Sequence, residues 1–423
     1  MRLHEHGRPT RVHARILLLA WGAWLTGFYS LMLPSFLLAA LRAELGLSEG
    51  ELAVLSGVGV GMTGAGGFLF GWLSDRFGRR PSLVLAVAVF SAGNLLCGLA
   101  PGTAALLLGR AVAGLGVGGT WGAGQAMIGE TFPAGARGRF GALAQSGAPL
   151  GFGLAAAVGS FAAPAVGWRP VFVGSALPAV LLLFHRRLPE SDVWLEYRRR
   201  LRGGALSGPE RRRAALPILA QAVAPDLAGR TARAFLLTAL NMAAYWFAVI
   251  WLPRYLQEQR GMSIFGTGWW TLTFVGGSLL GYLTFGAAAD ALGRRLAFSL
   301  YCVVTAIGLA MVTLWWRMLA DRPALGLGMM VVAGFGTGTW SCFGPYLSEL
   351  FPTRVRGAVM SVLMNASRGV MFLAPIVIAA VAGRWGLAGG VALAAGFALL
   401  AAGWIWTLPE TAGIRIDAPE EAA

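Results

Sequence analysis

The stretch Gly71-Trp72-Leu73-Ser74-Asp75-Arg76-Phe77-Gly78-Arg79-Arg80 lies between two apolar runs. Its spacing recurs 215 positions later, where Gly286, Asp290, Gly293, Arg294 and Arg295 repeat Gly71, Asp75, Gly78, Arg79 and Arg80. Glycines let a backbone turn tightly between two helices, and an aspartate is stabilised by a helix N-terminus or by arginine. Because arginine enters lipid only at a high cost in free energy, the arginines hold the turn at a membrane surface. We call 71–80 and 286–295 the signature loops and expect each to join two membrane helices.

The composition supports a membrane protein. The chain has 423 residues, of which 57% are hydrophobic and 13% are charged, and its mean hydropathy is +0.66. A soluble domain carries about 25% charged residues. Apolar runs near twenty residues recur along the chain, and each is long enough to cross a bilayer. We predict twelve spans, at about 16–39, 52–73, 82–100, 103–126, 140–163, 170–185, 234–256, 267–289, 296–316, 324–348, 357–382 and 387–408.

The net charge of +15 is a topology signal, and its distribution argues against nucleic-acid binding. If the N-terminus is cytoplasmic, 25 arginines fall on the inner side and 7 on the outer side of the predicted spans. Cytoplasmic loops carry such an excess of basic residues. We therefore expect an integral protein of the cell (inner) membrane with both termini in the cytoplasm.

A second motif occurs twice, and its two copies are separated by about half the length of the chain. Glu130-Thr131-Phe132-Pro133 is followed by Arg137, and Glu349-Leu350-Phe351-Pro352, 219 positions later, is followed by Arg356. At the same offset Thr120-Trp121 becomes Thr339-Trp340. Repeats of this length predict two structurally similar halves.

These motifs resemble those of the major facilitator superfamily, in which the signature loops lie between helices two and three and between helices eight and nine. Leu188-Pro189-Glu190-Ser191 and Leu408-Pro409-Glu410-Thr411 resemble the ends of the two halves in its sugar-porter and organic-ion branches. The resemblance implies an all-α integral membrane protein with twelve transmembrane helices in two pseudo-symmetric six-helix bundles. It also implies a secondary active transporter that works by alternating access and is not an enzyme.

The predicted organisation has five parts. They are a cytoplasmic tail (1–15), an N-terminal six-helix bundle (16–185), a cytoplasmic linker (186–233), a C-terminal six-helix bundle (234–408) and a cytoplasmic C-terminal tail (409–423). We expect a monomer in the lipid bilayer, without a cofactor, a metal site or a nucleic-acid partner.

An inner gate is predicted at the signature loops, where opposite charges can form a network in each half. Such pairs are individually weak, at about 0–1 kcal/mol, but together they bias two nearly balanced states. The predicted gate residues are Gly71, Asp75, Gly78, Arg79, Arg80, Glu130 and Arg137 in the first half, and Asp290, Arg294, Glu349 and Arg356 in the second.

Two arginines, Arg110 and Arg368, lie within predicted spans that contain no equally deep carboxylate. An anionic substrate would offset the cost of burying such a charge, and a structural role against backbone carbonyls is the alternative. Asn365 and Arg368 share one helix face, as do Asn241 and Tyr245. The predicted substrate-binding residues are Arg368, Asn365, Asn241, Tyr245, Trp121, Gln125, Gln145, Trp340 and Arg110.

The motifs are most similar to those of the sugar-porter and carboxylate (aromatic acid, sialate, lactate):proton symporter group. We therefore expect transport of a small organic anion, coupled to protons, with Glu130 or Asp75 as proton carriers. The usual helix-one aspartates are replaced by Thr26-Gly27-Phe28-Tyr29, and the glutamine-rich motif of sugar porters by 240–245. A transporter of sugars or other metabolites, a drug exporter and a transporter-like nutrient sensor remain alternatives.

Overall fold

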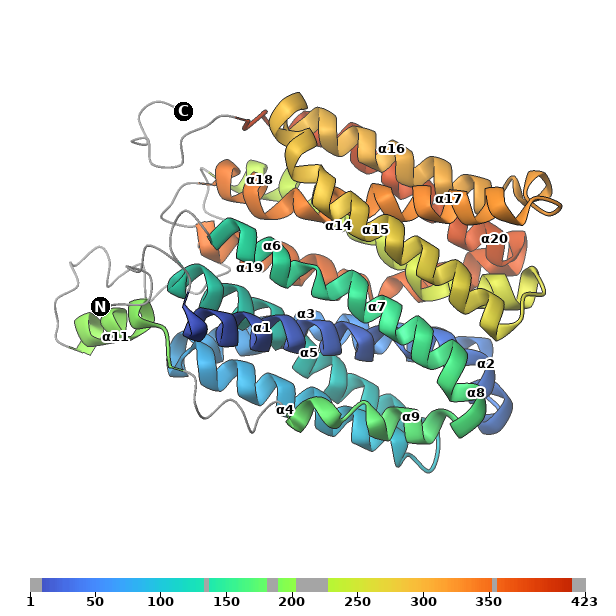
Figure 1. Ribbon diagram of the computed structural model, residues 1–423, viewed down its shortest axis with the longest axis horizontal. Coiled ribbons are helices and arrows are strands. Elements are labelled where there is room, and N and C mark those ends of the chain that lie inside the picture. Colours follow the sequence, from blue (N-terminus) through green and yellow to red (C-terminus); the bar gives the residue numbers. More distant parts are fainter. Residues whose placement is uncertain (1–9, 133–136, 181–188, 203–226, 352–355, 413–423) are drawn as a thin grey trace.

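The computed structural model is a bundle of long helices that run along a common axis (Figure 1). It describes residues 10–132, 137–180, 189–202, 227–351 and 356–412, and these residues contain helices and turns but no strand. Ten of the described segments are long and apolar enough to cross a membrane. One of them, Val362–Thr407, breaks at Gly386 and covers two predicted spans, and the sixth predicted span is described only as far as residue 180. The predicted twelve-helix membrane fold is confirmed.

The first half consists of helices from Arg11 to Val180, drawn in blue and green in Figure 1. Its helices are α1 (Arg11–Met32), α2 (Pro34–Leu45), α3 (Glu49–Phe77), α4 (Arg79–Gly98), α5 (Thr103–Thr131), α6 (Arg137–Gln145), α7 (Gly147–Ala157), η2 (Val158–Ala162), α8 (Ala163–Val166), α9 (Trp168–Gly174) and η3 (Leu177–Val180).

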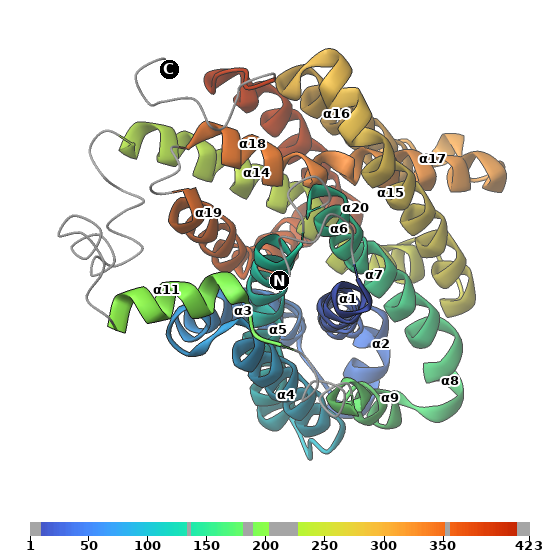
Figure 2. The ribbon, with the colours of Figure 1, turned by 60° about the vertical axis from the view of Figure 1, so that its left-hand side comes forward.

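The second half, drawn in yellow to red, packs beside the first (Figure 2). Its helices are α14 (Ala228–Arg254), η4 (Tyr255–Gln259), α15 (Ile264–Leu292), α16 (Arg294–Thr313), η5 (Trp316–Met318), α17 (Pro323–Gly336), η6 (Thr337–Ser341), α18 (Phe343–Leu350), α19 (Arg356–Val370), α20 (Leu373–Trp404) and η7 (Ile405–Thr407). In the chain, α11 (Asp192–Arg202) comes between the two halves, within the predicted linker. Helix α14 begins six residues before the predicted start of its span at 234.

The two signature loops form tight turns at the same end of the bundle, which we call the signature end. Gly78 (φ 119°) separates α3 from α4, and Gly293 (φ 88°) separates α15 from α16. These positive φ angles favour glycine, which has no Cβ. Gly71 and Gly286 lie inside α3 and α15, so the expectation that they also form the turns is wrong.

The opposite end of the bundle, which we call the far end, carries the connection between α2 and α3. Gly46 ends α2 in the left-handed conformation (φ 66°). The Ser48 hydroxyl then accepts a hydrogen bond from the Glu51 N–H, and the Glu51 carboxylate accepts one from the Ser48 N–H. This capping box fixes the start of α3, and it directs that helix back toward the signature end.

Equivalent close contacts hold the helices of each half together. A Cβ added at Gly114 in α5 would lie 2.1 Å from the carbonyl oxygen of Gly59 in α3, and one added at Gly334 in α17 would lie 2.0 Å from that of Phe274 in α15. Backbones approach this closely in membranes because glycine has no side chain. The same packing contact therefore occurs in both halves.

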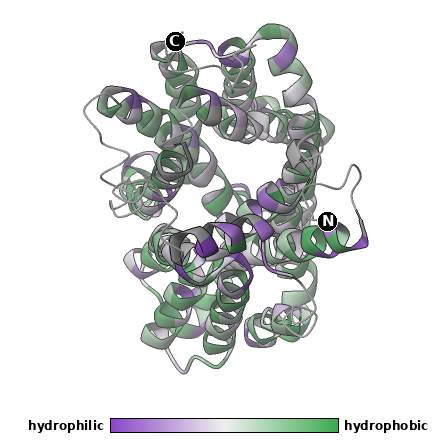
Figure 3. Cartoon of the chain, turned by 90° about the vertical axis from the view of Figure 1, so that its left-hand side faces the viewer, coloured by the Kyte–Doolittle hydropathy of each residue, from purple (hydrophilic) through white to green (hydrophobic). Residues whose placement is uncertain are grey.

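Large apolar side chains cover the outer surface of both halves. Leu108, Leu283 and Leu400 are exposed on α5, α15 and α20. Figure 3, seen from the signature end, shows hydrophobic residues around the outside of both groups of helices. Hydrocarbon tails are a suitable solvent for such a surface.

Candidate functional site

A cavity between the two halves is the candidate substrate site. Half of its lining side chains are aromatic, as is common in small-molecule sites, where a few polar groups set the orientation of the ligand. Both halves contribute to the lining, which consists of Trp24, Phe28, Leu31, Thr63, Val117, Gln145, Ala148, Tyr245, Trp246, Tyr282, Trp340 and Arg368.

Arg368 supplies the positive charge of this cavity. It projects from α19 of the second half, and its guanidinium carbon lies 5.5 Å from the ring centroid of Trp24 and 5.2 Å from that of Trp121, both in the first half. The side chain is 5% exposed, and no described carboxylate lies within ion-pairing distance of it. Indole rings attract a guanidinium but do not neutralise its charge. The cavity therefore has a cation available for an anionic ligand.

Four of the predicted substrate-binding residues, Arg368, Tyr245, Gln145 and Trp340, line this cavity. Trp121 does not line it but contacts two of them: it lies beside Arg368, and its indole N–H donates a hydrogen bond to the Gln145 amide oxygen at 2.8 Å. The Tyr245 and Trp340 rings pack edge to face with centroids 5.5 Å apart. These contacts hold the polar lining in place.

The other predicted lining residues do not line this cavity. Asn241 lines a separate pocket in the second half, and Tyr245 and Trp340 form the wall that the two pockets share. Asn365 packs against α3, where a Cβ added at Gly67 would lie 1.8 Å from its amide oxygen. Gln125 donates a hydrogen bond to the Gly141 carbonyl at 3.3 Å.

Arg110 lies apart from the cavity as well. It is 1% exposed, and its guanidinium donates hydrogen bonds to the carbonyl oxygens of Ser30 (2.9 Å) and Leu31 (3.4 Å). Arg110 therefore has the structural role that was the alternative to substrate binding, since it binds backbone carbonyls. Arg110 therefore supports the wall of the cavity from behind.

Tyr282 and Trp246 are cavity residues that sequence reasoning did not assign to the site. Trp246 follows the predicted Tyr245 directly, so the helical period places it on a different face. Tyr282 lies in the middle of an apolar span, and a polar-tipped ring at that depth is the signal that could have identified it.

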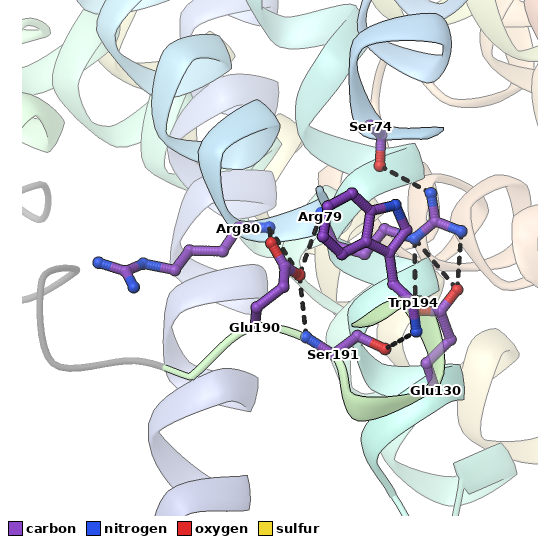
Figure 4. A network of polar contacts seen from close by, with 7 residues as sticks. All are labelled: Ser74, Arg79, Arg80, Glu130, Glu190, Ser191 and Trp194. Carbon is purple, nitrogen blue, oxygen red and sulfur yellow. Dashed lines mark hydrogen bonds and ion pairs between the residues drawn. The ribbon is translucent and has the colours of Figure 1, made fainter. Parts of the chain in front are cut away.

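At the signature end, the first half carries an ion pair between the predicted gate residues Arg79 and Glu130. The Arg79 Nη2 atom lies 2.8 Å from Glu130 Oε1, and its Nη1 donates to the Ser74 hydroxyl (Figure 4). Arg79 is the first residue of α4, and Arg80 is the second. The side chains of Asp75 and Arg137 lie outside the described part of the chain.

The second half repeats this cluster. The Arg294 guanidinium lies 2.7 Å from an Asp290 oxygen and 3.4 Å from Glu349 Oε1. The Thr411 hydroxyl donates to the other Glu349 oxygen at 2.6 Å. The Arg356 side chain lies outside the described part of the chain. Each of these ion pairs is formed within one half.

A glutamate from each Leu-Pro-Glu motif caps the helix that follows its signature turn. Glu190 accepts the backbone N–H groups of Arg79 and Arg80 at 3.1–3.3 Å (Figure 4). Glu410 accepts those of Arg294 and Arg295 at 2.9 and 3.0 Å. A helix N-terminus is a favourable place for a carboxylate because its first N–H groups are free. Sequence reasoning found both motifs but not these contacts, since the partners are more than 100 residues apart.

The two capping glutamates differ in acidity. Burial raises the pKa of the Glu190 carboxyl, and the hydrogen bonds from Ser191, Arg80 and Arg79 oppose that rise only in part. Burial also favours the neutral form of Glu410, but the N–H groups of Arg295, Ala412, Arg294 and Thr411 outweigh it and lower the pKa. The charged form of the carboxylate is therefore less favoured at Glu190 than at Glu410.

The fold and the paired clusters define a membrane transporter built from two similar halves. The sequence profile of the Major Facilitator Superfamily matches residues 19–265 and 234–422, and the chain belongs to this family. It is therefore a secondary transporter and not an enzyme.

Individual relatives agree with this assignment. A probable 4-methylmuconolactone transporter of Cupriavidus pinatubonensis is 30% identical, with 95% of this chain and 92% of the relative covered. A cis,cis-muconate transport protein of Acinetobacter baylyi is 28% identical, with 92% and 90% covered. The crystal structure of a D-xylose-proton symporter has a TM-score of 0.75 at 22% identity and covers 95% of this chain and 99% of that chain, which shows the shared fold.

Proposed function

We propose that this transporter moves a small organic anion, a carboxylate, by alternating access. The observation that carries the proposal is Arg368, which is buried at the cavity wall between two indoles without a described carboxylate partner. An unpaired arginine in a membrane costs at least about 2.5 kcal/mol on insertion scales. A bound carboxylate would remove much of that cost through two parallel hydrogen bonds to the guanidinium.

The rest of the lining favours a carboxylate substrate whose remaining part is flat and either unsaturated or aromatic. Phe28, Trp246 and Tyr282 present rings to the cavity, and Gln145 presents an amide. Aromatic rings pack well against flat π-systems, whereas a sugar requires many hydrogen-bonding partners. The relatives named for transport of muconate and of a muconolactone support this choice.

We propose that a proton moves with the anion and that Glu130 is its carrier. Glu130 lies near the signature end, where it pairs with Arg79. Protonation of Glu130 would release this ion pair and so couple proton binding to the state of the cluster. Asp75 is the second candidate, as the sequence suggests.

The proposed orientation places the signature end and both termini in the cytoplasm of a cell with an inner membrane. The asymmetric distribution of arginine supports it. In this orientation the charged clusters around Arg79 and Arg294 lie at the predicted inner gate, one in each half. Replacement of Asp75 by Asn should then slow transport and leave the inner side more accessible.

Uptake into proteoliposomes tests the substrate. The purified protein is assayed with radiolabelled benzoate, cis,cis-muconate and xylose, with and without an inward proton gradient. Carboxylate uptake that rises with the gradient supports the proposal. Uptake of xylose without uptake of either carboxylate would contradict the proposal of an anionic substrate.

Variants of Arg368 test the site. Loss of hydrogen bonds to a charged group costs about 1.5–3 kcal/mol, so Arg368→Ala should weaken carboxylate binding about 10- to 150-fold. Arg368→Lys should retain part of the affinity because it keeps the charge but loses the planar fork. Arg384→Ala, which removes an exposed arginine of α20, is the matched control. Equal uptake by the wild type and Arg368→Ala would show that Arg368 is structural.

A further inference from the structure

An ion pair joins the two halves at the far end. Glu49 begins α3 in the first half, and Arg254 ends α14 in the second. The two guanidinium Nη atoms lie 2.8 and 2.9 Å from the two Glu49 oxygens, so the pair is bidentate. Bidentate arginine–carboxylate pairs are among the stronger and more directional polar contacts in proteins.

Arg254 is held in position for this contact. Its side chain is 5% exposed, and its guanidinium carbon lies 5.1 Å from the ring centroid of Trp251 in the same helix. Its Nε atom donates to Glu258, one turn further along, at 2.8 Å. The arginine is thus oriented by its own half and spans the interface with its remaining donors.

Both charges of the pair have a second partner in their own half. Glu49 lies 2.7 Å from Arg42, which is in the last turn of α2. Arg254 lies 2.8 Å from Glu258. If α3 and α14 separate, Glu49 keeps Arg42 and Arg254 keeps Glu258, so neither charge is left alone.

The close backbone contacts between the halves begin at the same end of the bundle as the ion pair between Glu49 and Arg254. Along α3, a Cβ added at Gly57, Gly61 or Gly67 would lie within 3 Å of atoms of Phe372 or Asn365 in the second half. At Gly71, nearer the signature end, an added Cβ would meet no atom within 4 Å. The halves are therefore packed together from the far end to the level of Asn365.

We infer that Glu49 and Arg254 form the gate of the far end, and that Arg42 and Glu258, which already pair with these charges, are retained as their partners when the gate opens. The inference rests on the proposed alternation between two states but not on the proposed substrate. In the proposed orientation this is the outer gate.

Replacement of a gate residue and replacement of a retained partner should therefore have opposite effects. Glu49→Gln removes the contact between the halves and should favour opening of the far end. Arg42→Ala and Glu258→Ala each remove the partner that a gate charge would retain in the open state, and they leave the contact between Glu49 and Arg254, so they should favour closure.

Spin-label distances in lipid nanodiscs measure this directly. The labels are attached at Ala43→Cys in α2 and Ala320→Cys after η5, which are exposed positions at the far end of opposite halves. The three native cysteines are buried. The distance distribution is recorded without substrate by double electron–electron resonance.

We expect the population at long distance to rise at least threefold in Glu49→Gln and to fall in Arg42→Ala and Glu258→Ala. Glu49→Asp, which keeps the charge, should remain close to the wild type. Glu44→Gln is the matched control, because Glu44 lies at the same end but bonds to Trp168 and Arg169 of its own half.

An unchanged distribution in Glu49→Gln, or shifts of the same sign in all three variants, would overturn the inference. Arg254→Gln tests the pair from the other half if Glu49→Gln does not remain monodisperse. Since no substrate is present, failure of the carboxylate proposal would leave these distances unaffected.

Discussion

The guanidinium of Arg110 donates a hydrogen bond to the carbonyl oxygen of Ser30 at 2.9 Å. In a continuous helix this carbonyl would accept the N–H of residue 34, but that residue is proline and has no N–H. Helix α1 ends at Met32, and α2 begins at Pro34. Arg110 thus supplies the hydrogen bond that Pro34 cannot, and it stabilises the break beside the cavity residues Phe28 and Leu31.

Replacement of Arg110 by Met should destabilise the protein by about 1.5–3 kcal/mol, because the carbonyls lose a charged donor. The cost should be smaller in a Pro34→Ala background, where the substituted residue offers its own N–H to the Ser30 carbonyl. Thermal unfolding of the four proteins in detergent measures this coupling. An equal cost in both backgrounds would contradict the role assigned to Arg110.

Replacement of Gly67 by Ala should disrupt the packing of α3 on α19. The added Cβ would lie 1.8 Å from the Asn365 amide oxygen, and overpacking of this kind costs about 1–3 kcal/mol. Gly276→Ala is the control, because Gly276 is also helical but has no neighbour within 4 Å of an added Cβ. The melting temperatures of the two variants should separate clearly, and similar values would argue against this contact.

Replacement of Gly78 by Ala should be more harmful than replacement of Gly293. Both glycines have positive φ angles, and strain at such positions costs about 1–3 kcal/mol. At Gly78 the added Cβ would also lie 2.2 Å from Glu190 Oε2, whereas at Gly293 it would lie 3.0 Å from Glu410 Oε2. Thermal stability and transport rate are the measurements, and a larger loss at Gly293 would be inconsistent with the structure.

The two capping glutamates should respond oppositely to pH. The raised pKa of Glu190 means that its contribution to stability is greatest below its unfolded pKa and is lost as pH rises through the folded value. The lowered pKa of Glu410 means that its contribution is present above its unfolded pKa and is lost as pH falls through the folded value.

Melting temperatures of Glu190→Gln and Glu410→Gln between pH 4 and pH 7.5 test this difference. Glu410→Gln should be the more destabilised variant at neutral pH, and its deficit should shrink toward pH 4. The deficit of Glu190→Gln should not shrink in this way. Parallel pH profiles for the two variants would show that the two contacts are equivalent.

The sequence predicted the elements that depend on local composition or on the repeat. Apolar length identified the spans because a bilayer requires about twenty apolar residues in a helix. The shared spacing around Gly78 and Gly293 identified the two turns. Arg368 stood out as a charge in an apolar span, and it lines the cavity.

Contacts between distant segments depend on the tertiary structure. Arg110 and Arg368 look alike in the sequence, since both are arginines within spans, but the helix beside each one decides its surroundings. A broken helix offers carbonyls to Arg110, whereas two indoles leave Arg368 beside a cavity. Asn241 shares a helix face with Tyr245 but lines another pocket, because Tyr245 and Trp340 lie between the two.

Hydropathy, charge asymmetry and repeats are properties of the chain, and they suffice to specify a membrane protein with two similar halves. The pairing of charges depends instead on how the helices pack. Glu49 and Arg254 are 205 positions apart, and Glu190 meets a turn more than 100 residues before it. The physical reason is that the strength of an ion pair or a helix cap falls off within a few ångströms, and such distances are set by how the helices pack.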